Sequence, residues 1–265
     1  MYDYHLHSNN SADGKRSIDE VCSIMIERGF KEIAFTDHLD YDCPAQNDHL
    51  LDYDRYSADI EEARQKYGRL IHIIKGMEIG LQPQVVEKNV EYTLKNKFDF
   101  VIGSVHHVDN LELFTGDFCQ GKIREEAYPY YLEEVCRMVE SFHNFHVLGH
   151  LDVVRRYKGF ENRTMTVEEF PDLIDAILKN LIETGRGIEV NSSGYRHGLN
   201  DTLPSLNIVK RFRELGGEIV TVGSDAHRGD AFGYKITESF RVLKEAGFAH
   251  VCLFREGNPI MVDIP

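Results

Sequence analysis

Acids and histidines occur together in several short motifs of the chain. Residues 3–7 read DYHLH, and the motifs TDH and SDAH follow further along. Alternate side chains of a strand share a face, so we expect Asp3, His5 and His7 on the same side. Imidazole and carboxylate groups are good ligands for zinc, iron and manganese. A metal ion would also give buried imidazole nitrogens the partners that they otherwise lack.

Short apolar stretches that alternate with longer amphipathic ones are expected to position these motifs. The expected strands are 2–6, 32–36, 70–76, 99–104, 145–149, 187–191, 218–223 and 249–254. The expected helices are 17–28, 54–67, 84–97, 124–142, 168–184, 204–215 and 235–246. Such alternation predicts a parallel α/β fold, and a β/α barrel fits the chain length. With no linker or repeat in view, we predict one domain over residues 1–265.

Nearly every expected strand ends in a histidine or an acid. These residues are His5, His7, Asp37, His38, Glu78, His106, His107, His150, Asp152, Glu189, Asn191, Asp225 and His227. The carboxyl ends of parallel strands open on one face, so these side chains should converge there. They exceed what one ion can use and include no cysteine, which predicts a site with two or three metals. Because neighbours on a strand face opposite ways, we prefer His106 to His107 as a ligand.

Composition narrows the class of protein. The chain has 265 residues and a formal net charge of -14, which argues against a nucleic-acid partner. No apolar run approaches the ~18 residues of a membrane span, and no secretion signal is visible. The five cysteines never form a Cys-x-x-Cys pair, which favours reduced thiols and a cytoplasmic location.

The order of the motifs is itself informative. DYHLH, FTDHLD, GMEIG, GSVHH, GHLD and GSDAH resemble the motif series of the PHP (polymerase and histidinol phosphatase) superfamily. The similarity covers residues 3–227, and the segments SNNSADG and EVNSSGYR look most like the monofunctional histidinol-phosphatases. The resemblance implies a distorted (β/α)7 barrel with a trinuclear metal centre at the carboxyl ends of the strands.

The resemblance also implies which residues bind each of the three ions. The first ion would have His5, His7, Glu78 and Asp225, the second Glu78, His106 and His150, and the third Asp13, His38 and His227. We expect the carboxylates of Asp3 and Asp37 to orient ligand imidazoles, each by accepting a hydrogen bond from the ring nitrogen that does not bind the ion. The catalytic group would comprise Glu78, Asp225, His227 and Asp37. Zinc, manganese and iron all suit such ligands.

The implied reaction is hydrolysis of L-histidinol phosphate to L-histidinol and phosphate, in histidine biosynthesis. A metal-activated hydroxide would attack phosphorus, and a metal-bound water, Asp152 or Asp37 would protonate the leaving group. Arginine matches phosphate oxygens, so the predicted substrate contacts are Arg155, Arg156, Arg196 and His197, with Arg196 preferred.

Other functions fit parts of the pattern. A different small phosphate ester, such as a nucleotide or a sugar phosphate, would use the same centre. A proofreading nuclease is disfavoured by the negative charge. Metal-dependent amidohydrolases also begin with His-x-His, but they usually rely on a bridging carboxylated lysine or on one metal with a late aspartate. For the lysine, the chain offers at a strand end only the poorly placed Lys75. A barrel that stores or senses metal is the non-catalytic alternative.

Overall fold

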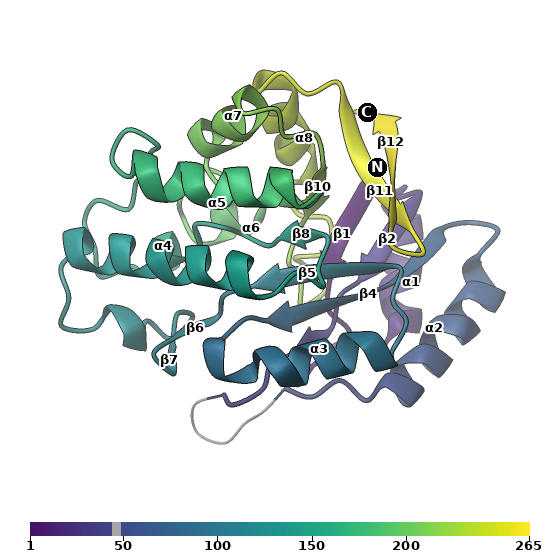
Figure 1. The fold of residues 1–265 in the computed structure, drawn as a ribbon. Helices are drawn as coiled ribbons and strands as arrows, with labels where there is room; N and C mark the ends of the chain where they lie inside the picture. The colour runs from purple at the N-terminus through teal and green to yellow at the C-terminus, as the bar shows by residue number, and fades with distance from the viewer. Residues whose placement is uncertain (44–48) are drawn as a thin grey trace.

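The computed structural model describes residues 1–43 and 49–265, and Figure 1 shows the arrangement of their helices and strands. The strands are β1 (Tyr2–Leu6), β2 (Glu32–Phe35), β3 (His38–Leu39), β4 (His72–Gly80), β5 (Phe100–Ser104), β6 (His107–Val108), β7 (Leu111–Glu112), β8 (Val147–Leu148), β9 (Gly187–Asn191), β10 (Val220–Gly223), β11 (His250–Arg255) and β12 (Asn258–Asp263). The helices are α1 (Ile18–Glu27), α2 (Tyr53–Tyr67), α3 (Val86–Lys95), α4 (Arg124–Ser141), α5 (Pro171–Glu183), α6 (Ser193–Arg196), α7 (Leu206–Glu214) and α8 (Ile236–Glu245). Short 3-10 turns occur at η2 (Pro83–Val85), η3 (Asp117–Cys119) and η4 (Val153–Arg156).

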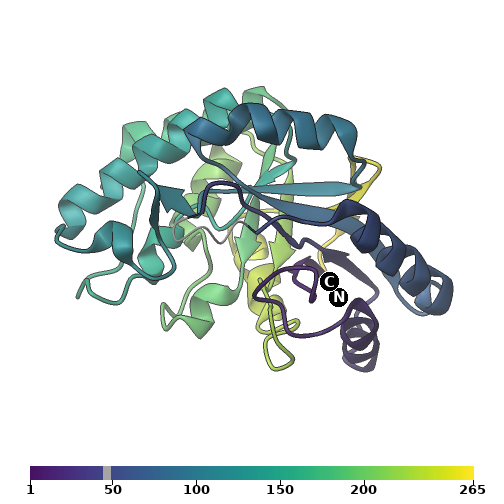
Figure 2. The same cartoon turned by 90° about the horizontal axis from the view of Figure 1, so that it is seen from below.

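A parallel sheet forms the centre of the molecule. Its strands follow the order β1-β2-β4-β5-β8-β9-β10, with β3 paired to the far end of β4. The two outer strands approach each other, because Leu6 pairs with Ala226 and the His7 amide donates to the Ala226 carbonyl at 2.9 Å. The helices lie around the outside of this nearly closed sheet (Figures 1 and 2). The predicted distorted (β/α)7 barrel is confirmed.

Local sequence signals set the limits of the helices. Ser17 and Glu20 form a capping box, in which each side chain accepts a hydrogen bond from the other residue's amide, at 3.2 and 2.9 Å. Gly29 follows α1 at φ 76°, a conformation that glycine adopts without strain. The helix predicted at 17–28 therefore begins and ends within one residue of the observed α1.

The C-terminal strands pack against the barrel instead of joining it. The strand predicted at 249–254 is β11, which pairs antiparallel with β12. The reason is local: Glu256 and Gly257 both have positive φ, which favours a tight hairpin turn. The hairpin buries Phe254 against Tyr4 and Phe100 and so closes the amino-terminal end of the barrel. Both chain ends lie close together there (Figures 1 and 2).

Two apolar cores stabilise this arrangement. The larger core fills the space between the sheet and the surrounding helices. The smaller core lies within the barrel, beneath the hairpin, and comprises Tyr4, Ala34, Ile74, Phe100, Ile102, Val147, Cys252, Leu253 and Phe254. The opposite end of the barrel, at the carboxyl ends of the strands, is left for polar side chains. Among the described residues, every helix falls short of the length and apolar character needed to cross a bilayer.

Candidate metal centre

Glu78, on β4, is the hub of a cluster of histidines. Its side chain is completely buried, and both carboxylate oxygens face imidazole nitrogens. Oε2 lies 3.1 Å from His5 Nε2, 3.1 Å from His38 Nδ1 and 3.5 Å from His7 Nε2, while Oε1 lies 3.2 Å from His106 Nε2 and 3.0 Å from His150 Nε2. One carboxylate thus meets residues from the ends of several strands, as the parallel topology predicts.

Two further acids face the same histidines. Asp225 Oδ1 lies 3.8 Å from His5 Nε2, 3.6 Å from His7 Nε2 and 3.7 Å from His227 Nδ1. Asp13 Oδ2 lies 3.0 Å from His227 Nε2 and 3.7 Å from His38 Nε2. All nine residues that the sequence predicts as metal ligands therefore come together at one end of the barrel.

The chemistry of this cluster fits divalent metal ions. Several of its buried polar atoms have no hydrogen-bond partner among the described residues: His5 Nε2, His7 Nε2, His38 Nδ1 and Glu78 Oε2. An unsatisfied buried polar atom costs about 1–3 kcal/mol. Overlapping groups of three have ligand atoms close enough to share one ion, including His5, Glu78 and His150. A bound cation would give His5 Nε2, His7 Nε2 and Glu78 Oε2 a common partner.

The charges within the cluster suit ligation. Burial favours the neutral form of Glu78, but the imidazoles of His5 and His106 outweigh it and hold the Glu78 pKa well below its usual value. Burial also opposes the charged form of His106, yet Asp40 and Glu78 raise its pKa to about 10, so this imidazole must release a proton when it binds an ion. Burial lowers the pKa of His7 well below its ordinary value, which leaves that imidazole neutral. Ionised carboxylates and a neutral imidazole are the forms that bind metal.

Backbone strain marks two of these ligands. His150 has φ 24° and Asp225 has φ 53°, conformations that residues with a side chain adopt at a cost of order 1–3 kcal/mol. The space behind His5 is equally tight, because a Cβ added at Gly223 would lie 2.1 Å from Glu189 Oε1. His150 and Asp225 thus have strained backbones, and His5 is closely packed against β10.

Two buried carboxylates support the cluster and were not predicted in that role. Glu189, on β9, lies 2.7 Å from His5 Nδ1 and also accepts from the His150 amide at 3.0 Å. Asp40 lies 2.8 Å from His106 Nδ1 and 3.4 Å from His38 Nδ1. Glu189 stands at a strand end in the sequence, and Asp40 follows His38 by two residues. These positions place both carboxylates near the site, but they do not indicate which histidine each one contacts.

Asp3 does not orient an imidazole, contrary to expectation. The register between β1 and β2 shifts by one residue between Asp3 and Leu6, which is a β-bulge. The bulge interrupts the alternation of side chains, so Asp3 and His5 contact different neighbours. Asp3 accepts hydrogen bonds from the Ser224 amide at 2.9 Å, the Ser224 hydroxyl at 2.5 Å and the Gly233 amide at 3.1 Å. Its role is to hold the segment after β10.

Asp37 contacts no imidazole nitrogen among the described residues, so it does not orient one as expected, and its catalytic role stays a prediction. One of its oxygens accepts from the Ser8 amide at 2.7 Å and from the Ser11 hydroxyl at 2.7 Å, and the other accepts from the Ser8 hydroxyl at 2.8 Å. The carboxylate is completely buried by these contacts. Asp37 therefore fastens the loop after β1, which carries Asp13.

The predicted substrate arginines have different environments. Arg155 is buried and donates to Asp152 at 2.6 Å, to Asp201 at 3.1 Å and to the Arg163 carbonyl at 3.0 Å. Each nitrogen of Arg155 has a protein acceptor, so these contacts do not favour the predicted phosphate contact of Arg155, which stays a prediction. Asp152, a candidate proton donor, is the acid of this ion pair, and it also accepts a hydrogen bond from the Ser205 amide.

Arg156 and Arg196 both reach the segment that carries Asp225. Arg156 Nη2 lies 2.5 Å from Asp225 Oδ2 and 2.5 Å from Ser193 Oγ, and its buried Nε has no partner among the described residues. Arg196 donates to the Ser224 and Asp225 carbonyls at 2.6 and 2.7 Å. These bonds occupy both terminal nitrogens of Arg196, and the phosphate contacts of Arg156 and Arg196 stay predictions. Burial and the charge of Arg156 lower the pKa of His197 to about 4.

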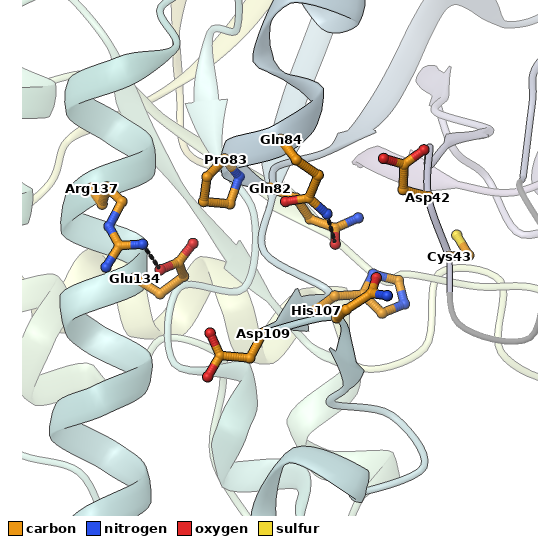
Figure 3. Close-up of a pocket in the computed structure, with 10 residues that line it drawn as sticks. Asp42, Cys43, Gln82, Pro83, Gln84, His107, Asp109, Glu134 and Arg137 are labelled. Atoms are coloured by element: carbon orange, nitrogen blue, oxygen red, sulfur yellow. Dashed lines mark hydrogen bonds and ion pairs between the residues drawn. The ribbon is translucent and has the colours of Figure 1, made fainter.

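A polar cavity of about 680 Å³ opens beside the cluster (Figure 3). His107 lines it, together with Gln82, Asp109, Glu134 and Arg137. Its neighbour in the sequence, His106, instead has Nε2 3.2 Å from Glu78. The two adjacent side chains thus lie in different places: His107 lines the cavity, and His106 belongs to the metal cluster.

Comparisons with known proteins agree with this geometry. The PHP domain profile matches residues 3–193. A histidinol-phosphatase from Lactococcus lactis is 30% identical over 95% of this chain and 93% of its own length. A protein named "Probable histidinol-phosphatase" from Thermotoga maritima is also 30% identical, over 96% of this chain and 95% of its own.

A solved structure extends the likeness to three dimensions. The histidinol phosphate phosphatase of Lactococcus lactis, complexed with zinc, L-histidinol and phosphate, superposes with a TM-score of 0.91 at 28% identity. The match covers 98% of both chains. Sequence, fold and the Glu78-centred cluster together show that this chain belongs to the PHP domain family.

Proposed function

We propose that this protein is a metal-dependent phosphatase that hydrolyses L-histidinol phosphate to L-histidinol and phosphate. One observation carries the proposal: the Glu78-centred cluster lies in a chain that superposes over 98% of its length on an enzyme solved with zinc, L-histidinol and phosphate. The relative's product and cofactor are the ones expected here from the sequence. Histidine biosynthesis is the pathway that such a reaction serves.

We assign three divalent ions to the cluster. The first would bind His5, His7, Glu78 and Asp225, the second Glu78, His106 and His150, and the third Asp13, His38 and His227. Bound ions would supply an activated water as nucleophile and neutralise charge on the phosphoryl oxygens. Zinc is favoured because the Lactococcus lactis enzyme was solved with it, while manganese and iron suit the same donors.

The residues around the ions would hold the phosphate and position Asp225. Arg156 brings a positive charge to Asp225 and has an unpartnered Nε, so its guanidinium can also serve a phosphate oxygen. Arg196 fixes the backbone on the other side of Asp225. With both contacts in place, Asp225 presents its second oxygen to the histidines. His197, next to Arg196, stays a predicted substrate contact.

The alternative functions find less support. An amidohydrolase of the type with a bridging carboxylated lysine finds no support, because Lys75 Nζ contacts Tyr53 Oη at 3.0 Å and Ser57 Oγ at 3.4 Å, both on α2 outside the barrel. The net charge of -14 disfavours a nuclease. Another small phosphate ester stays the main alternative substrate, because the metal cluster by itself does not select the alcohol.

A substrate panel with the zinc-loaded protein tests the proposal. We expect phosphate release from L-histidinol phosphate with a higher kcat/KM than from a nucleoside monophosphate or a sugar phosphate. His7→Ala and Asp225→Ala should lose both zinc and turnover. Preference for another ester would reject the substrate, whereas bound zinc without turnover on any ester would favour metal storage.

Two general expectations join this proposal. We propose a cytoplasmic location, since Cys22, Cys119 and Cys252 are buried thiols outside any disulfide; cell fractionation tests it. We also propose that residues 1–265 form one domain, because the C-terminal hairpin shares a core with the barrel strands. A single cooperative unfolding transition is the expected result, and two separated transitions would contradict it.

A further inference from the structure

Asp40 lies between two histidines of the metal cluster. Its buried carboxylate places Oδ1 2.8 Å from His106 Nδ1 and Oδ2 3.4 Å from His38 Nδ1. Both histidines turn their other nitrogen toward the cluster. His106 Nε2 lies 3.2 Å from Glu78 Oε1, and His38 Nε2 lies 3.3 Å from His227 Nε2.

This geometry decides which nitrogen of each ring carries the proton. A neutral imidazole that binds an ion through one nitrogen has an N–H at the other, and a carboxylate is a strong acceptor for it. Glu78 also lies near His38 Nδ1, but in our assignment it is a ligand of two ions. Asp40 already bonds His106 Nδ1, and His38 Nδ1 has no hydrogen-bond partner among the described residues, although Glu78 Oε2 at 3.1 Å and Asp40 Oδ2 at 3.4 Å are within reach. With Glu78 engaged by two ions, Asp40 is the acceptor left for the N–H of His38.

The surrounding backbone fixes the position of the Asp40 carboxylate. Asp40 pairs with His49 through both backbone groups, at 2.8 and 3.0 Å. Gly80 lies against the side chain, and a Cβ added there would come within 1.9 Å of Asp40 Oδ1. Any residue larger than glycine at position 80 would push the Asp40 carboxylate away from the histidines.

We propose that Asp40 is a positioning residue that fixes the tautomers of His38 and His106 and so couples the retention of the second and third ions. The inference rests on the three-ion assignment above. Glu189 offers a contrast, because the imidazole that its carboxylate meets is that of His5, which belongs to the first ion. Glu189 reaches His150 only through the backbone amide, a bond that the amide oxygen of glutamine can keep. The cluster thus has one supporting carboxylate for one ion and another shared by two.

Zinc titration of the chelator-treated protein tests the coupling, with a competing chromophoric chelator to report the affinity at each step. Asp40→Ala should weaken two of three binding steps by about 10- to 100-fold. Gly80→Ala should do the same while keeping the aspartate, because it displaces the carboxylate. Glu189→Gln should weaken one step only, and thermal melting with excess zinc checks that each variant is folded.

Asp40→Asn separates positioning from direct ligation. Its amide oxygen can accept from only one histidine, so one of the two affected steps should recover relative to Asp40→Ala. If Asp40→Ala and Gly80→Ala bind zinc like the wild type, or weaken a single step, the coupling is wrong. Should Asp40→Ala fail to fold, Gly80→Ala decides in the same way. A wild-type stoichiometry below three overturns the three-ion assignment, and with it this inference, independently of any phosphatase result.

Discussion

His106 should make the metal-free protein less stable as the pH rises. Burial alone would lower the pKa of this imidazole, but Asp40 at 2.8 Å and Glu78 at 3.2 Å raise it to about 10. The unfolded chain titrates near 6.5, the ordinary value for histidine. Between these two pH values the folded protein therefore holds a proton that the unfolded chain has released.

The structure sets the size of this effect. His106 by itself should lower the free energy of unfolding by about 1.4 kcal/mol per pH unit across that interval, or about 5 kcal/mol in all. His5 and His38 add to this slope, because, despite their burial, neighbouring carboxylates also raise their pKa values. The stabilisation from His106 is fully present below the unfolded pKa of 6.5 and is lost as the pH rises through about 10. Bound metal replaces the proton, so the dependence belongs to chelator-treated protein.

Urea unfolding at a series of pH values, with chelator present, measures this slope. His106→Gln should reduce the loss of stability per pH unit by about 1.4 kcal/mol relative to the wild type. His146→Gln is the matched control, because burial lowers the pKa of His146 to about 4 and the ring stays neutral throughout this range. Identical slopes for the wild type and His106→Gln would refute the reasoning, as would a reduced slope in His146→Gln.

Four further predictions concern other residues of the site and its surroundings. Arg156→Met should lower kcat/KM by about 100- to 1,000-fold in steady-state assays, because a charged donor to the phosphate is lost. Arg155→Met should instead lower the free energy of unfolding by about 3–5 kcal/mol, since it leaves its buried acidic partner unpaired. Gly223→Ala should cost about 1–3 kcal/mol in thermal melting, because its Cβ would collide with Glu189. His107→Ala should keep the full zinc content, measured by elemental analysis, because this side chain lines the neighbouring cavity.

Each of these predictions has an outcome that contradicts it. A stable Arg155→Met protein with low kcat/KM would place that residue in the substrate site. Unchanged kcat/KM in Arg156→Met would remove Arg156 from it. A Gly223→Ala protein as stable as the wild type would mean that Glu189 can move aside at no cost, and loss of zinc in His107→Ala would place that ring among the ligands.

The sequence by itself was enough to predict the barrel and the metal ligands. Apolar strands alternating with capped helices indicate parallel topology, and parallel strands all end at one rim. Residues as distant as His5 and His227 could therefore be placed together without coordinates. Motif order carried the assignment further, because every predicted ligand except Asp13, which lies in the loop after β1, stands at or just after a strand end.

The supporting contacts depended on the tertiary structure. The β-bulge that separates Asp3 from His5 arises from the pairing of two strands and leaves no local signal in DYHLH. Arg155 and Arg156 are neighbours with the same chemistry, yet only packing shows that Asp152 neutralises the first and Asp225 faces the second. A strand pattern predicts which rim a side chain reaches, whereas its partner there depends on distances of a few ångströms between segments far apart in the chain.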